Sequence, residues 1–102
     1  MNQVMLVGRL SKEPYKELIE NGKEETRIEL AVNRSYKNVE GIYETDLIEC
    51  ALWSGLSEQM NNYCHKGDVI GVRGRLETRP FKRQIVIVEK LTFLSSAREN
   101  DN

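Results

Sequence analysis

Strict alternation of apolar and polar residues dominates this chain and predicts β-strands. The clearest example is residues 26–34, where Ile28, Leu30 and Val32 share one face and Arg27 and Glu29 point the other way. A two-residue period of this kind is typical of a strand with one buried face. We therefore expect a sheet whose core contains these three aliphatic side chains.

The same alternation recurs along the chain and predicts four more strands. Their ranges are 2–10, 45–53, 68–79 and 84–94. Residues 15–19 are expected to resume pairing before a two-residue turn at Asn21-Gly22, because Asn-Gly is the preferred centre of such a hairpin. A polar connection is expected over 35–44, with Gly41 at its tip, and a tight turn over 80–83.

The period changes between the third and fourth main strands, where a short helix is predicted. Its apolar residues recur at helical spacing: Leu56, Met60, and Tyr63 or Cys64. Ser54 is a candidate N-cap and Gly67 a candidate stop. We expect this helix to face the core.

This order of elements predicts an all-β fold. Three strands, one helix and two strands make the five-stranded Greek-key barrel of the OB-fold, with its helix between strands 3 and 4. Gly71 and Gly74 interrupt the fourth strand, where glycine usually marks a bulge or a sharp coil. We expect one OB-fold domain over 1–94 and a short disordered tail over 95–102.

Composition is consistent with one cytoplasmic domain. The 102 residues are 39% hydrophobic and 30% charged, and no apolar stretch approaches the ~20 residues of a membrane span. The N-terminus has no basic region before its apolar run, so no signal peptide is expected. Cys50 and Cys64 lack metal-ligand spacing, so we expect buried or half-buried free thiols, no metal and no cofactor.

The charge is unevenly distributed, although the net charge is only -1. Residues 66–83 contain six Lys or Arg and two acids, a local excess of +4, whereas residues 38–49 contain four acids and no Lys or Arg. A basic face can therefore coexist with a neutral total.

Two segments place aromatic rings between cations, as a single-stranded nucleic-acid site requires. They are Arg34-Ser35-Tyr36-Lys37 and Arg79-Pro80-Phe81-Lys82-Arg83. Bases stack on exposed rings, and Lys and Arg meet phosphates. An outward row of arginines lies beside them, and Trp53 ends the third strand. The candidate nucleic-acid-binding residues are Arg34, Tyr36, Lys37, Trp53, Arg73, Arg75, Arg79, Phe81, Lys82 and Arg83.

Each of these features has another interpretation. A row of arginines on a strand also protects an edge from aggregation. Tyr36 could cover the core, and Trp53 could tuck under the helix instead of facing a strand of nucleic acid. Phe81 beside Pro80 has little core to enter, so exposure is favoured there.

Several segments resemble the bacterial single-stranded DNA-binding protein family, in the family's order. They are NQVMLVGRL, LAVNRSYKN, residues 46–53, YCHKGD and GVRGRLETR. The resemblance implies non-specific binding and protection of single-stranded DNA in replication, recombination or repair. It also implies a homo-oligomer, either a tetramer or a dimer, with bases stacked on Tyr36, Trp53 and Phe81.

The chain departs from that family pattern at several places. Leu47 stands where a stacking aromatic is expected, and Glu49 and Glu77 stand where basic or neutral residues are commoner. The last hairpin is short, and the linker and acidic, Phe-terminated tip that recruit partner enzymes are absent. We therefore expect no tail-mediated recruitment of partners.

Two hypotheses from different classes follow. The first is a module that binds single-stranded DNA, either nucleoid-associated or encoded by a phage or mobile element. The second is an OB-fold protein-interaction module of a replication or primosome assembly, with weakened DNA binding. The sequence has no nucleophile motif, catalytic carboxylate pair or phosphate loop, so no enzymatic activity and no catalytic residue are expected.

Overall fold

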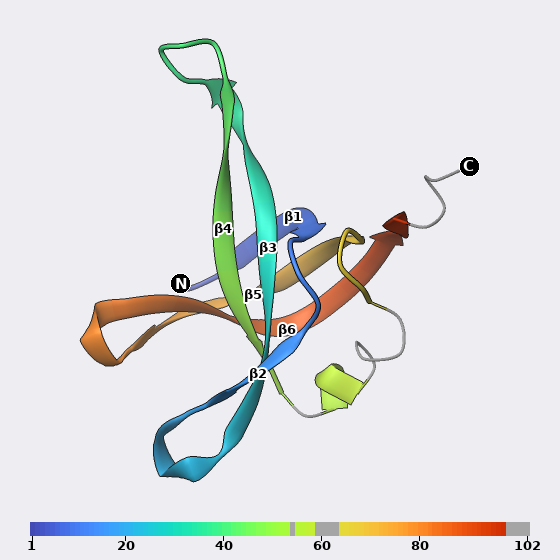
Figure 1. Cartoon of the computed structure of the whole chain (residues 1–102). Helices are drawn as coiled ribbons and strands as arrows, with labels where there is room; N and C mark the ends of the chain where they lie inside the picture. The colour runs from blue at the N-terminus through green and yellow to red at the C-terminus, as the bar shows by residue number, and fades with distance from the viewer. Residues whose placement is uncertain (54, 59–63, 98–102) are drawn as a thin grey trace.

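The computed structural model describes residues 1–53, 55–58 and 64–97 and is built mainly from six strands (Figure 1). The strands are β1 (Val4–Leu10), β2 (Tyr15–Leu18), β3 (Glu24–Lys37), β4 (Tyr43–Leu52), β5 (Val69–Arg79) and β6 (Arg83–Ser95). Short 3-10 turns, η1 (Glu20–Gly22) and η2 (Pro80–Lys82), join β2 to β3 and β5 to β6. The predicted strands are all present.

The sheet closes into a barrel of five strands, which confirms the predicted OB-fold. The strand order is β1-β5-β6-β4-β3, and β1 pairs with β3 through Arg9–Ala31 and Leu10–Leu30 to complete the circuit. Strand β2 is a short sixth strand that pairs only with the beginning of β3. The β4–β6 contact is parallel, with Cys50 opposite Val86, whereas the other pairs are antiparallel.

The barrel interior is filled by the residues that the alternation assigned to it. Ile28 and Leu30 from β3, Cys50 from β4 and Ile70 from β5 have no exposed surface. Leu56 joins this core from the helical segment 55–58, as predicted. The rest of the predicted helix, including Met60, Tyr63 and the cap Ser54, lies outside the described residues.

The hairpins extend further from the barrel than the sequence predicted (Figure 1). Strands β3 and β4 continue pairing to Lys37 and Tyr43, so the expected loop over 35–44 is an arm with a short tip at Gly41. The β5–β6 hairpin likewise continues past β1, whose pairing with β5 stops at Val4 and Gly74. Leu76, predicted to point inward, lies on this extension and is exposed.

The turn at Asn21-Gly22 is longer than the two residues predicted. Both residues have positive φ, 79° and 72°, a conformation that Asn and Gly adopt readily in tight turns. Glu20 joins them in η1, and the Ile19 N–H closes the turn by donating to the Lys23 carbonyl at 2.9 Å.

Gly74 marks the sharpest irregularity of the barrel. A Cβ at this position would lie 1.9 Å from the carbonyl oxygen of Ile87, so the two backbones approach closely only because residue 74 is glycine. The β5–β6 register shifts between Arg73 and Gly74, which confirms the predicted bulge.

A buried carboxylate joins the end of the chain to the entrance of β5. Asp68 accepts hydrogen bonds from the backbone N–H groups of His65, at 2.8 Å, and Ala97, at 3.0 Å. Strand β6 ends at Ser95, which pairs with Val69, one residue past the predicted end. Residues 98–102 lie outside the described part of the chain. Among the described helical segments, none is long and apolar enough to cross a membrane.

Candidate nucleic-acid interface

The candidate site lies on the outer face of the sheet formed by β3, β4, β6 and β5. Register places Ala51 of β4 and Arg75 of β5 on opposite sides of Ile87 of β6. Side chains at paired positions share a face, so this row lies on the same face as Glu77 of β5. Trp53 follows directly after the end of β4 and borders this face. Polar and aromatic residues from four strands therefore meet on one surface.

A chain of ion pairs, here called the arginine–glutamate network, crosses this surface. From the outer edge of β5 inward, Glu77 contacts Arg75 at 3.6 Å and Arg79 at 2.6 Å, and Arg79 contacts Glu25 at 2.9 Å. The network then continues through Arg27 to Glu49 and Arg83. Its members are Arg75, Glu77, Arg79, Glu25, Arg27, Glu49 and Arg83.

Arg27 is the buried centre of this network. Its Nε lies 3.1 Å from Glu25 and its Nη1 lies 2.8 Å from Glu49, while only 8% of its side chain is exposed. Burial alone raises the pKa of Glu25, but hydrogen bonds from Arg79 and Arg27 outweigh it and hold that pKa below its usual value. The carboxylates of Glu25 and Glu49 are therefore both held by the buried guanidinium of Arg27.

Tyr15 of β2 also contacts the network. Its hydroxyl donates to Glu49 at 3.2 Å. Burial, followed by the charge of Glu49, raises the pKa of Tyr15 to about 12, because both disfavour the phenolate. The hydroxyl therefore remains a donor at neutral pH.

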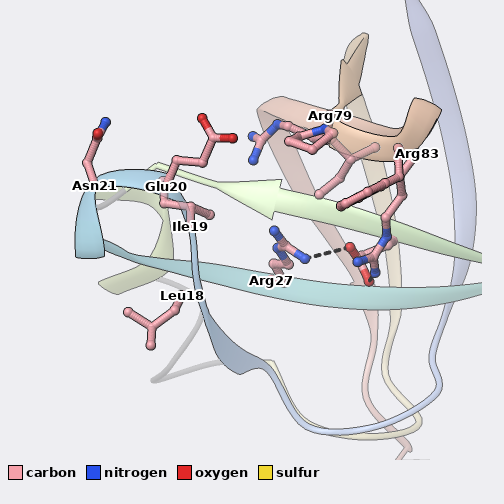
Figure 2. Close-up of a pocket in the computed structure, with 11 residues that line it drawn as sticks. Leu18, Ile19, Glu20, Asn21, Arg27, Arg79 and Arg83 are labelled. Carbon is pink, nitrogen blue, oxygen red and sulfur yellow. Dashed lines mark hydrogen bonds and ion pairs between the residues drawn. The ribbon is translucent and has the colours of Figure 1, made fainter.

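A cavity of about 500 Å³ opens where the β2–β3 and β5–β6 hairpins face each other (Figure 2). Leu18 and Ile19 form one wall, Arg79 and Arg83 lie across from them, and Arg27 lies between. Phe81 and Ile85 add apolar surface. The cavity thus combines apolar walls with arginines, a combination that suits a base and its phosphate. Glu20 and Glu49 also line it.

Trp53 lies beside the outer end of the network. Its side chain lines a groove of about 200 Å³ together with Arg75, Glu77 and Ile87. The residue is 60% exposed, and its ring covers Gly55, where an added Cβ would lie 2.2 Å from the ring. Trp53 therefore rests on the start of the helical segment and still presents surface to the groove.

The β5–β6 hairpin presents Phe81 to solvent at its tip. Phe81 is fully exposed, as expected, and both Phe81 and Lys82 have positive φ, 65° and 60°. Neither residue is glycine, so the turn holds two side chains in a conformation that L residues rarely adopt. Arg79 and Arg83 pair across the base of this turn.

The first predicted segment lies separately, on the β3–β4 arm. Arg34 is held there by Asp46, with Nη2 to Oδ1 at 2.9 Å, and by Glu44. The hydrogen bonds that Arg34 donates to Asp46 raise the pKa of Arg34, and the guanidinium lowers the pKa of Asp46. Tyr36 is 65% exposed and does not cover the core.

Lys37 and Arg73 are also placed away from the network. The Lys37 Nζ lies 5.6 Å from the centre of the Tyr43 ring, near the tip of the arm. Arg73 lines a different groove, with Met5, Val7 and Lys90 on the β1 side of the barrel. The predicted stripe of Arg73, Arg75 and Arg79 is thus divided between two surfaces.

The structure therefore brings together six of the predicted residues and separates four. Around the network lie Trp53, Arg75, Arg79, Phe81, Lys82 and Arg83, whereas Arg34, Tyr36 and Lys37 lie on the arm and Arg73 lies in the β1 groove. Sequence reasoning missed Arg27, Glu25 and Tyr15. The signal that could have found Glu25 and Arg27 is the alternation of acid and base on the polar face of β3, whereas Tyr15 lies on β2 and carries no such signal.

The described residues contain no cluster of His, Cys, Asp and Glu suited to hold a metal ion. Both cysteines are free and buried, as predicted. Burial raises the pKa of Cys50 to about 12, so this thiol is not an activated nucleophile.

Residues 1–93 match a family model described as the single-strand binding protein family. The chain is 45% identical over 83 residues to single-stranded DNA-binding protein B of Bacillus subtilis (strain 168), covering 81% of this chain and 74% of that protein. It is 42% identical over 84 residues to single-stranded DNA-binding protein A of the same strain, covering 82% of this chain but 49% of that protein. The chain thus spans about half the length of protein A.

Solved structures share the fold. A single-stranded DNA-binding protein of Plasmodium falciparum, solved in complex with single-stranded DNA, superposes with a TM-score of 0.77 and 25% identity, covering 93% of this chain and 96% of that one. A Thermus aquaticus single-stranded DNA-binding protein superposes with a TM-score of 0.72 and 24% identity, covering 95% of this chain and 52% of that one. Since the family model covers nearly the whole sequence and the fold agrees with it, the chain belongs to the single-strand binding protein family.

Proposed function

We propose that this protein binds single-stranded DNA without sequence preference and protects it during replication, recombination or repair. The observation that carries the proposal is the groove in which Trp53 lies beside Arg75. There a base would stack on the indole ring while the neighbouring phosphate meets the guanidinium. Phe81 and the cavity beneath it would extend the path along the β5–β6 hairpin.

Contacts of this kind read no base edge. Stacking is available to every base, and phosphate contacts carry no sequence information. We propose that the protein acts as a binding module and not as an enzyme. We further propose that it works as a homo-oligomer, a tetramer or a dimer, in the cytoplasm, without a metal or cofactor.

The family and the exposed aromatic residues both support this function over the protein-interaction module. Residues 1–93 match a family whose description is single-strand binding, and an exposed Trp beside arginine and an exposed Phe suit base stacking. Glu49 and Glu77, which counted against DNA binding in the sequence, are paired with arginines.

The test is fluorescence anisotropy of labelled oligo-dT of several lengths, titrated with the full chain between 20 mM and 500 mM salt. A matched duplex is the control. We expect salt-sensitive binding to the single strand and much weaker binding to the duplex, because phosphate neutralisation releases counterions. Equal affinity for both, or no binding at low salt, would refute the proposal.

A further inference from the structure

The two ends of the arginine–glutamate network differ from its centre in exposure. Arg75 and Arg83 have 44% and 58% of their side-chain surface exposed, whereas Arg27 has 8% and Arg79 has 22%. The outer guanidiniums can therefore rotate toward solvent, while the inner two are confined by the barrel.

Each carboxylate that holds an outer arginine also has an inner partner. Glu77 is bound by Arg75 at 3.6 Å and more closely by Arg79 at 2.6 Å. Glu49 is bound by Arg83, and it also accepts from Arg27 at 2.8 Å and from the Tyr15 hydroxyl at 3.2 Å. Departure of an outer arginine therefore leaves neither carboxylate without a partner.

From this arrangement, and on the basis of the proposed function, we infer that Glu77 and Glu49 are intramolecular competitors of DNA phosphate. In the free protein they hold Arg75 and Arg83. A phosphate that enters the Trp53 groove or the cavity below Phe81 takes over these guanidiniums, and the inner arginines keep the carboxylates neutralised. The two glutamates would thus reduce affinity, so that a bound strand is released more readily.

This arrangement differs from an ordinary basic patch. Within the described part of the chain, Arg73 and Lys82 have no carboxylate within ion-pair distance, so they would meet phosphate without exchange. At Arg75 and Arg83, a phosphate contact must replace an existing ion pair. The net gain in binding free energy at these two arginines is smaller, and fewer counterions are released than the number of arginines suggests.

The decisive variant is Glu77→Gln, because Arg79 keeps its two bonds to Glu25 and the fold is retained. We expect it to bind oligo-dT about 3- to 10-fold more tightly than the unmodified chain at low salt, since an exposed ion pair contributes little and is easily outweighed by phosphate. The dependence of log affinity on log salt should also become steeper. The control is Glu58→Gln, which removes the same charge from an exposed residue of the helical segment.

A double-mutant cycle with Arg75→Gln separates local exchange from a general charge effect. If Glu77 acts by holding Arg75, the increase in oligo-dT affinity caused by Glu77→Gln should be at least threefold smaller when Arg75 is also replaced by Gln. The inference is overturned if Glu77→Gln binds no more tightly than the unmodified chain, if Glu58→Gln gives the same gain, or if the gain persists without Arg75.

The same titrations distinguish this failure from failure of the proposed function. The unmodified chain tests DNA binding, and the variants test only the role of the glutamates. Urea unfolding of each variant checks the fold. Should Glu77→Gln be unstable, Arg83→Gln provides the second test: it should weaken binding less than Lys82→Gln, which gives up no ion pair, and a larger loss at Arg83 would contradict the inference.

Discussion

Arg79 on β5 binds Glu25 on β3 through two hydrogen bonds, Nη1 to Oε1 at 3.2 Å and Nη2 to Oε2 at 2.9 Å. The two residues lie 54 positions apart in the chain. Their contact links the β2–β3 and β5–β6 hairpins across the cavity between them. Arg79, which the sequence predicts to meet phosphate, therefore also holds the two walls of the site together.

Replacing Arg27 tests the structural role of the network. Arg27→Met leaves Glu25 and Glu49 without their shared buried partner, and breaking a buried ion pair costs about 3–5 kcal/mol. We expect a loss of that size in the free energy of unfolding, measured with urea. Arg83→Met, at an exposed end, should cost less than about 1 kcal/mol. Equal losses would contradict the distinction between centre and edge.

Gly74 and Gly71 form a matched pair in β5. Gly74→Ala places a Cβ 1.9 Å from the Ile87 carbonyl oxygen, whereas the nearest atom to a Cβ at Gly71 is 3.8 Å away. We expect Gly74→Ala to destabilise the barrel by about 2 kcal/mol or more and Gly71→Ala to change stability by less than about 1 kcal/mol. Thermal unfolding of both variants measures this. Similar melting temperatures would show that the bulge tolerates a side chain.

Phe81 should contribute to binding and not to stability. Phe81→Gly removes an exposed ring and relieves a positive φ, so the unfolding midpoint should hardly change. Its affinity for oligo-dT should fall by about 1–3 kcal/mol, the usual contribution of one stacked base. Phe81→Tyr keeps the ring and should retain affinity. Undiminished binding by Phe81→Gly would remove Phe81 from the path.

The Tyr15 hydroxyl makes stability depend on alkaline pH. Its pKa is raised from 10.0 to about 12 in the folded chain, so the folded state keeps a proton that the unfolded state loses. This contribution is complete below about pH 10 and is lost as pH rises toward 12. In urea titrations between pH 9 and 11.5, the unmodified chain should lose stability more steeply than Tyr15→Phe. Parallel curves would contradict the raised pKa.

Much of the barrel follows from local patterns. The alternation in β3 identified Ile28 and Leu30 as core residues, and Gly74 identified the bulge, because both signals depend on a few neighbouring residues. Leu76 was assigned wrongly to the core. Alternation gives the face of a strand but not the point at which a hairpin leaves the barrel.

The site was harder to predict, because it depends on long-range pairing. Phe81 was identified as exposed from its tight turn alone. The partners of Arg34 and Arg79 were not foreseen, since Asp46 and Glu25 reach them only after the strands pair. For the same reason, Arg27 appeared in the sequence as one more solvated charge on the outer face of β3.

The most direct test of single-stranded DNA binding at this surface is the fluorescence of Trp53, the only Trp of the chain. It is titrated with oligo-dT at several salt concentrations, beside a duplex control and a gel-shift assay of the same samples. We expect strong quenching by the single strand, weaker as salt rises, and little response to the duplex. A gel shift without quenching would place the strand away from the Trp53 groove, and the absence of both signals at low salt would contradict DNA binding itself.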